Sequence, residues 1–226
     1  EAKVMKKQLL IIGITLVLII LGLSGCTQEN SSSDQSKNQT TPPSTESLQT
    51  ILAKAETIGS MYYEITTSTS MTGAGTQTAT IKIWEKTPYL KEDITSVTAG
   101  ISTTYSIIKR PEGIYSYDTT QNKYVLTTNV ALLQQANREM IQDLVNNQTL
   151  TNLGTETING KTATVIQYIS SEGGSPTTIK IWIWNEKGVP LKMQFSTTSE
   201  ETTLTMYYNY SNYSFADIPD STFSVS

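Results

Sequence analysis

The chain of 226 residues has no histidine and one cysteine, Cys26. Without histidine it has no Ser–His–Asp triad and no Cys–His nucleophile pair, and a lone cysteine forms no internal disulfide. The usual nitrogen and sulfur ligands of zinc are therefore missing as well. We expect no catalytic residues, no metal and no cofactor. Chemistry that uses carboxylates alone, as in glycoside hydrolysis, is the enzymatic alternative that this composition leaves open.

Positive charge is also scarce. The sequence carries 16 basic and 20 acidic residues, for a net charge of −4, and its arginines are Arg110 and Arg138. Proteins that bind nucleic acids cluster lysine and arginine to neutralise phosphates. We therefore expect no nucleic-acid partner.

Residues 1–25 have the pattern of an export signal. Lys6 and Lys7 precede an uncharged apolar run, Leu9 to Leu23, and two small residues come before Cys26. A positive start, an apolar centre and small residues before a cleavage point define such a signal. The run is shorter than the roughly 20 residues of a transmembrane helix, although an uncleaved anchor is the alternative. In both cases the rest of the chain lies outside the cytoplasm and is tethered to a membrane.

The end of this segment, Leu23-Ser24-Gly25-Cys26, is similar to the lipobox of prokaryotic lipoproteins. The resemblance implies that the Cys26 thiol carries diacylglycerol and that the mature chain begins there. Residues 26–45 are rich in Ser, Thr, Asn and Pro, and the part after Cys26 has no aliphatic residue, so we expect a disordered tether. The folded domain then covers residues 46–226.

Asn-x-Ser/Thr sequences mark candidate glycosylation sites. In a chain this rich in Asn, Ser and Thr, several of them arise by chance. They occur at Asn30, Asn38, Asn147, Asn209 and Asn212.

Two segments have the apolar spacing of helices. In residues 46–58, Leu48, Ile51, Leu52, Ala55 and Ile58 share one face, with Ser44 or Thr45 as a cap and Gly59 at the exit. A second helix is expected from about residue 130 to 146, with Leu133, Ala136, Met140, Leu144 and Val145 on its apolar side. Packing against a core is the expected role of both faces.

The remaining sequence alternates with period two between turn signals such as Asn159-Gly160 and Lys187-Gly188. This pattern predicts about ten antiparallel strands. A sheet of that size curls. We therefore predict an α+β fold, an incomplete (half) antiparallel β-barrel whose concave face is covered by two or more helices, leaving an apolar cleft between sheet and helices.

A weak internal repeat accompanies these strands. Thr80-Ile81-Lys82-Ile83-Trp84 recurs as Thr178-Ile179-Lys180-Ile181-Trp182, and the segment from Glu85 to Lys91 is echoed by Glu186 to Lys192. Each copy follows a helix and a strand pair. The two halves are therefore either duplicated units or hairpins that look alike by chance.

The order of these segments resembles the LolA/LolB/LppX superfamily of lipoprotein- and lipid-binding proteins over about residues 48–225. The matching segments are Tyr62–Ile65, Ile81–Lys91, Gly113–Asp118, Asn159–Ala163, Ile181–Lys192 and Tyr213–Phe223. The resemblance implies a half-barrel with an apolar cavity for acyl chains and no catalysis. LolA itself is a soluble shuttle, whereas this chain has the lipidation motif, as LolB and LppX do. The family's arginine between barrel and lid has no match at Arg110 or Arg138.

Apolar residues of the concave face are the predicted cavity lining, with ordinary core packing as the alternative for each. They are Ile81, Ile83, Leu133, Ile179, Ile181, Ile183, Met193, Phe195, Leu204 and Met206. By alternation Trp84, Trp182 and Trp184 fall on the opposite face, where they pack under a helix or meet a partner, unless the two faces are inverted.

The leading hypothesis is thus an anchored envelope lipoprotein that binds lipid or lipidated cargo and acts in lipid or lipoprotein transfer. Its alternatives are a sensory or regulatory module that binds a membrane protein, and a structural surface lipoprotein. An enzyme with paired carboxylates is the least favoured.

Overall fold

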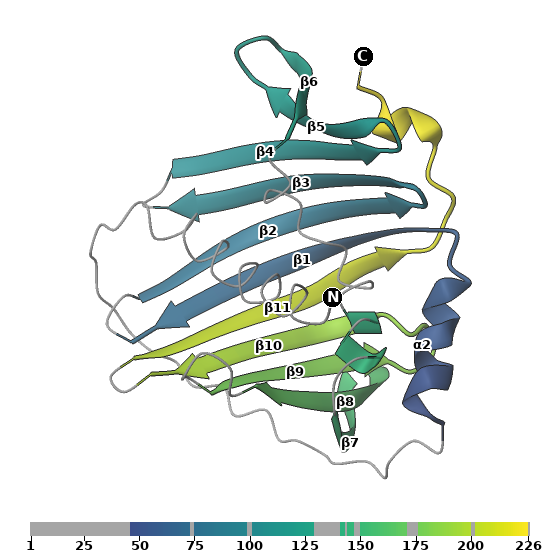
Figure 1. Ribbon diagram of the computed structural model, residues 1–226, viewed down its shortest axis with the longest axis vertical. Helices are drawn as coiled ribbons and strands as arrows, with labels where there is room; N and C mark the ends of the chain where they lie inside the picture. Colours follow the sequence, from purple (N-terminus) through teal and green to yellow (C-terminus); the bar gives the residue numbers. More distant parts are fainter. Residues whose placement is uncertain are drawn as a thin grey trace.

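The computed structural model describes residues 46–72, 75–98, 101–128, 141–142, 144–146, 150–170, 176–199 and 202–225. Within these ranges the chain forms one sheet of eleven strands, the α-helix α2 (Leu48–Glu56) and the short 3-10 helix η2 (Asp220–Phe223) (Figure 1). The strands are β1 (Ser60–Met71), β2 (Gly75–Lys86), β3 (Tyr89–Thr98), β4 (Ile101–Arg110), β5 (Gly113–Asp118), β6 (Lys123–Thr127), β7 (Thr151–Ile158), β8 (Lys161–Ser170), β9 (Thr177–Trp184), β10 (Pro190–Thr198) and β11 (Thr203–Ser214).

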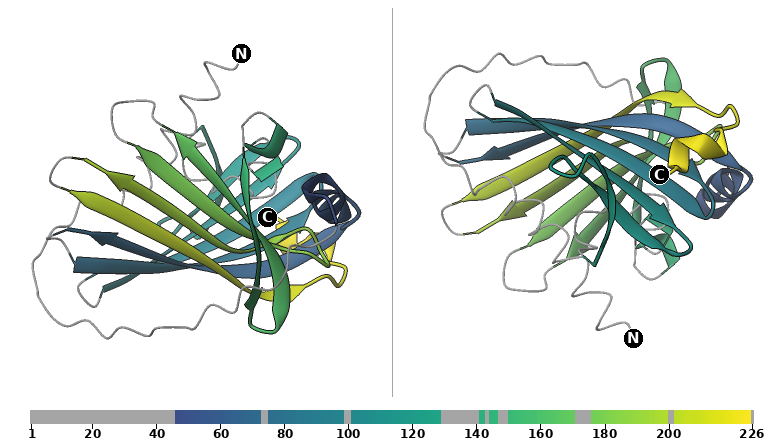
Figure 2. Two further views of the ribbon diagram at one scale, coloured as in Figure 1. Left: turned by 90° about the horizontal axis from the view of Figure 1, so that it is seen from below. Right: turned by 90° about the horizontal axis from the view of Figure 1, so that it is seen from above.

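All strand pairs are antiparallel, and the strands lie in the order β6-β5-β4-β3-β2-β1-β11-β10-β9-β8-β7. Strands adjacent in sequence are neighbours, except for β6 and β7, and the sheet is joined at its centre by the pairing of β1 with β11. Figure 2 shows that the sheet is twisted and curled rather than flat. It stays open, with β6 and β7 as its two outer edges in the described part of the chain. The open antiparallel sheet that the sequence predicts is confirmed, with eleven strands where about ten are expected.

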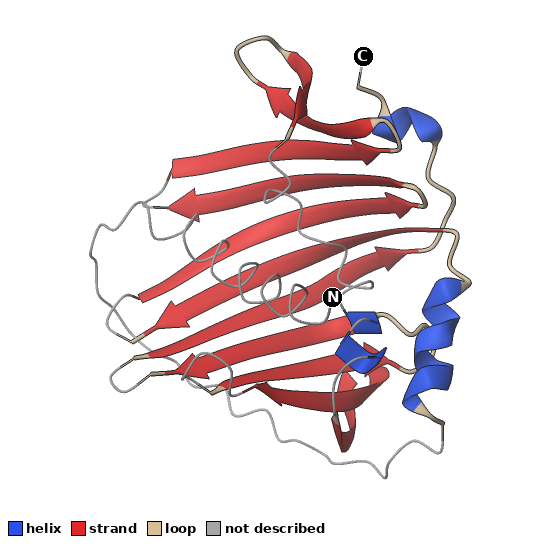
Figure 3. Cartoon of the chain, viewed as in Figure 1, coloured by secondary structure: helices blue, strands red, loops and turns tan. Residues whose placement is uncertain are grey.

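Helix α2 confirms the first expected helix with slightly narrower bounds. The predicted cap, Ser44 or Thr45, is wrong, because the helix begins later: the Ser47 hydroxyl oxygen accepts a hydrogen bond from the Thr50 backbone N–H (3.1 Å) and caps its start. The helix lies across the strand ends at one end of the sheet (Figure 3) and buries Ile51, Leu52 and Ala55. Of the second expected helix, residues 141–142 and 144–146 are helical, and the others, including Leu133, lie outside the described residues. The predicted cover of the sheet by two or more helices is therefore not tested along its length.

The β9–β10 turn holds α2 in place through Gly188. This residue has a backbone φ of +72°, a conformation that residues other than glycine rarely adopt. A Cβ atom there would lie 2.3 Å from the Ile51 backbone oxygen and 3.0 Å from the Ala55 nitrogen. Glycine thus allows the turn to touch the helix backbone directly. In the predicted Asn159-Gly160 turn both residues have positive φ, and they close the β7–β8 hairpin tightly.

The repeat seen in the sequence corresponds to two four-strand units, β1–β4 and β8–β11. The pairings match at the tryptophans: Trp84 faces Tyr62 and Lys91, and Trp182 faces Val165 and Lys192. Beyond them the β9–β10 pair has a register shift between Pro190 and Lys192 that β2–β3 lacks. The two units lie side by side in the sheet, because β11, the last strand of the second unit, pairs with β1, the first strand of the other. The shared register at this site agrees with a duplicated unit, and chance similarity of hairpins stays the alternative.

Candidate functional site

We define the inner face as the side of the sheet that packs with α2. A single apolar cluster runs along it from β8 through β9, β10, β11, β1 and β2 to β3. Its buried residues on the sheet are Met61, Tyr63, Ile65, Ile81, Ile83, Leu90, Ile166, Ile179, Ile181, Ile183, Met193, Met206, Tyr208 and Tyr210. Continuous apolar surface across seven strands is the principal feature of this face.

The structure brings together nearly all the residues predicted to line a cavity. Ile81, Ile83, Ile179, Ile181, Ile183, Met193 and Met206 are buried in this cluster, and Phe195 and Leu204 pack against it partly buried. Leu133 lies outside the described residues. That these side chains contact a ligand stays a prediction, because the described part of the chain also fits ordinary core packing.

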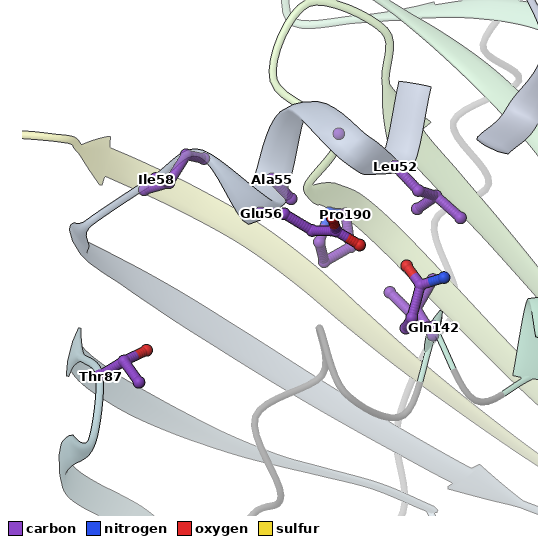
Figure 4. Close-up of a pocket in the computed structure, with 9 residues that line it drawn as sticks. Leu52, Ala55, Glu56, Ile58, Thr87, Gln142 and Pro190 are labelled. Carbon is purple, nitrogen blue, oxygen red and sulfur yellow. The ribbon is translucent and has the colours of Figure 1, made fainter. Parts of the chain in front are cut away.

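A cleft of about 310 Å³ opens where α2 meets the sheet (Figure 4). Apolar side chains from α2 and the β9–β10 turn form much of its wall, and residues 141–142 close another side. Its lining residues are Leu52, Ala55, Glu56, Ile58, Thr87, Ile141, Gln142, Gly188 and Pro190. None of them belongs to the predicted cavity set, because the cleft is created by the contact between helix and turn. A second cleft, of about 390 Å³, is lined by Lys54, Glu186 and Lys187 among others and is charged.

Tyrosines gather on the inner face beside this end of the sheet. The ring centroid of Tyr63 lies 5.3 Å from that of Tyr213 and 6.2 Å from that of Tyr210. Simple alternation would put Tyr210 and Tyr213 on opposite faces. Asn212 has a φ of 55° at a register shift between β1 and β11, and this bulge turns both rings inward.

The tyrosine hydroxyls in this cluster differ in their hydrogen bonding. The Tyr213 hydroxyl donates to the Pro190 carbonyl oxygen (2.5 Å). The Tyr210 side chain is 4% exposed, and among the described residues its hydroxyl has no hydrogen-bond partner. Leaving a buried hydroxyl unbonded costs about 1–3 kcal/mol. Burial also raises the pKa of Tyr208 to about 12 and that of Tyr210 well above 10, so both phenols stay neutral.

Two carboxylates interrupt the apolar face in the first unit. Glu92 is fully buried and Glu85 is 8% exposed. Sequence reasoning missed them, although alternation places Glu85 with Ile81 and Ile83, and Glu92 with Leu90. The period-two pattern alone therefore places both carboxylates on the inner face.

Trp84 and Trp182 lie on the outer face, opposite the isoleucines, as the alternation predicts. The Lys91 Nζ atom lies 5.0 Å from the Trp84 ring centroid, and the Lys192 Nζ atom lies 4.8 Å from that of Trp182. The Trp182 indole N–H also donates to the Glu156 carboxylate (2.8 Å). Trp184 packs near α2, with its ring centroid 6.1 Å from that of Phe215.

The candidate glycosylation sites differ in accessibility. Asn209 is exposed on β11. The Asn212 amide is exposed but donates to the Glu64 carboxylate (2.9 Å). Asn30, Asn38 and Asn147 lie outside the described residues, as does Cys26. Glycosylation and lipidation therefore stay predictions.

Among the described residues there is no group of three or more Cys, His, Asp or Glu side chains that could hold a metal ion. Across the same part of the chain, no helix has the length and apolar character required to span a bilayer.

No protein-family model matches the sequence, and no curated protein matches it. Solved structures do resemble the fold. A LolA superfamily protein from Nitrosomonas europaea is 13% identical, with 78% of this chain and 97% of that chain covered and a TM-score of 0.39. The Mycobacterium tuberculosis lipoprotein LppX is 13% identical over 72% of this chain and 90% of its own, with a TM-score of 0.43.

The complex of MucA and MucB from Pseudomonas aeruginosa gives 12% identity and a TM-score of 0.48, and covers 79% of this chain and 60% of that chain. These likenesses concern the fold alone. A LolA superfamily protein and LppX, members of the superfamily that the sequence resembles, are thus among the solved structures to which this fold is similar.

Proposed function

We propose that this chain is a membrane-anchored lipoprotein outside the cytoplasm that binds lipid or lipidated cargo by its acyl chains and acts in lipid or lipoprotein transfer. The observation that carries the proposal is the inner face, where apolar side chains from seven neighbouring strands form one continuous cluster. Such a surface suits acyl chains, because burial stabilises by about 25 cal/mol per Å² and makes no directional demand. The proposed activity is binding and not catalysis.

The cleft beside α2 supports the same proposal. It lies at one end of the apolar face, and its walls include Leu52, Ile58 and Pro190 (Figure 4). Apolar walls with a few polar groups are typical of sites for apolar small molecules. An acyl chain that lies along the sheet would end at this cleft.

The Cys26 anchor is the second part of the proposal. A lipidated cysteine followed by a polar tether keeps the domain close to its own membrane and favours local handling of lipid over long-range shuttling. Mass spectrometry of the N-terminus tests this part. A diacylated Cys26 is expected, and an intact peptide across Gly25-Cys26 would contradict it.

Lipid binding is tested with residues 26–226 carrying Cys26→Ser, purified without detergent. Native mass spectrometry should find co-purified lipid, and a fluorescent acyl probe should be taken up at a one-to-one ratio. Phe195→Ala should weaken uptake, because Phe195 packs on the inner face, whereas the adjacent Gln194→Ala on the outer face should not. If there is no bound lipid and no uptake, and a membrane protein is captured at equal stoichiometry, the regulatory alternative replaces this proposal.

A further inference from the structure

Tyr210 differs from its neighbours on the inner face. It extends from β11 opposite Ile65 of β1, within the apolar cluster that the proposed function assigns to acyl chains. Its side chain is 4% exposed, and its hydroxyl oxygen is inaccessible to solvent. In the described part of the chain, no donor or acceptor reaches this oxygen. Native structures rarely leave such a group unbonded, so an unbonded hydroxyl at a binding face suggests a ligand partner.

The same fold does provide partners for adjacent phenols. The Tyr213 hydroxyl, three residues further along, donates to the backbone oxygen of Pro190. The Tyr62 hydroxyl donates to the Glu64 carboxylate. The buried and unbonded hydroxyl of Tyr210 therefore contrasts with the bonded hydroxyls of Tyr213 and Tyr62.

The surroundings determine what Tyr210 can recognise. Its ring lies 6.2 Å from that of Tyr63, and the pKa of its hydroxyl is well above 10, so the group is a neutral donor. A charged acceptor such as phosphate would have to give up its hydration in this apolar setting. An uncharged carbonyl oxygen joined to a hydrocarbon chain satisfies the donor and fits the apolar walls.

We propose that Tyr210 donates a hydrogen bond to the acyl carbonyl of the bound ligand, whether an ester or an amide, and so sets where along the inner face the head of the acyl chain lies. This assignment rests on the proposed function, since it requires that acyl chains occupy the inner face. It adds a polar recognition point to a surface whose other contacts are non-directional. Ligands with a carbonyl at the chain head should therefore be preferred over plain hydrocarbons.

The test compares methyl palmitate with octadecane, which has the same chain length and no acceptor. Residues 26–226 with Cys26→Ser are loaded from cyclodextrin with both together, and the bound amounts are measured by gas chromatography. Tyr210→Phe removes only the hydroxyl, and the ratio of bound ester to bound alkane should fall about five- to tenfold, as expected for one hydrogen bond. Tyr207→Phe, on the outer face of the same strand, is the matched control and should leave the ratio unchanged.

A second readout uses the ligand-free protein. Because its hydroxyl is unbonded there, Tyr210→Phe should melt at the same temperature as the parent protein or higher. A clearly lower melting temperature would mean that the hydroxyl is already bonded within the protein, which would overturn the assignment. An unchanged ester-to-alkane ratio in Tyr210→Phe would overturn it too, with the proposed function intact. Binding of neither compound by the parent protein would remove the proposed function and this assignment together.

Discussion

The two four-strand units of the sheet share a register but differ in the side chains on their inner faces. Ile81 and Ile83 of the first unit occupy the same positions as Ile179 and Ile181 of the second. Next to them, Glu85 and Glu92 in the first unit correspond to Ile183 and Met193 in the second. Both units thus have the same strand pairing at these positions, whereas the side chains on their inner faces differ. The second unit is the more apolar, and α2 is docked on its β9–β10 turn.

We expect the largest loss of stability when a carboxylate of the first unit is placed at the matching position of the second. Ile183 is fully buried and corresponds to Glu85. Ile183→Glu places a carboxylate in apolar surroundings and should lower the free energy of unfolding by more than about 4 kcal/mol. Ile183→Val is the control and should cost about 0.5–1.5 kcal/mol. Denaturant unfolding measures both, and equal losses would mean that this position tolerates charge as its counterpart does.

The next prediction concerns the docking of α2, which exists in one unit only. Gly188→Ala adds a Cβ against the Ile51 backbone oxygen at 2.3 Å and also strains a left-handed residue. We expect a loss of about 2–4 kcal/mol in stability and a changed cleft, since Gly188 lines it. Thr87→Ala, at the corresponding exposed position of the first unit, should change stability by less than about 0.5 kcal/mol. Thermal unfolding that shifts equally for the two variants would contradict this account.

How much of the fold and of the site can be predicted from the sequence depends on whether local or long-range interactions determine each feature. Ile81, Ile83, Ile179 and Ile181 were assigned to one face because period-two alternation is a local property of a strand. Tyr213 was not, because the bulge at Asn212 breaks the alternation and nothing in the local pattern signals it.

The cleft was beyond sequence reasoning for a different reason. It depends on Gly188 approaching a helix more than 130 residues earlier in the chain, and the turn signal at Lys187-Gly188 indicated a reversal of direction but not what the turn touches. Likewise, the repeat in the sequence suggested two similar hairpins, but the pairing of β1 with β11 that sets the units side by side is a long-range contact.

The outer face allows a finer comparison. Trp182 is 6% exposed, and its indole N–H donates to Glu156, whereas Trp84 is partly exposed and its ring lies 5.1 Å from that of Tyr62. Trp182→Phe leaves the Glu156 carboxylate without this donor and should cost about 1–2 kcal/mol. Trp84→Phe should cost less than about 1 kcal/mol, because it loses mainly ring area and part of the contact with Lys91. Chemical denaturation that ranks the two in reverse would contradict the importance of the hydrogen bond from Trp182 to Glu156.

The smallest effect concerns acid stability, at one outer-face position where the first unit has an ionisable group and the second does not. Glu64 faces Lys82 in the first unit, and Gln167 faces Lys180 in the second. Hydrogen bonds from the Tyr62 hydroxyl and the Asn212 amide lower the pKa of Glu64 below 4.5.

Because this pKa is lower in the folded than in the unfolded chain, the ionised Glu64 stabilises the fold above about pH 4.5, and this contribution is lost as pH falls through the folded pKa. Glu64→Gln makes the first unit like the second at this position and should flatten the decline of stability below about pH 4.5. Urea unfolding at several pH values measures the slope, with Gln167→Ala as a control that should leave it unchanged. Parallel curves for Glu64→Gln and the parent protein would mean that the hydrogen bonds to Glu64 do not persist in solution, and that the outer faces of the two units behave alike.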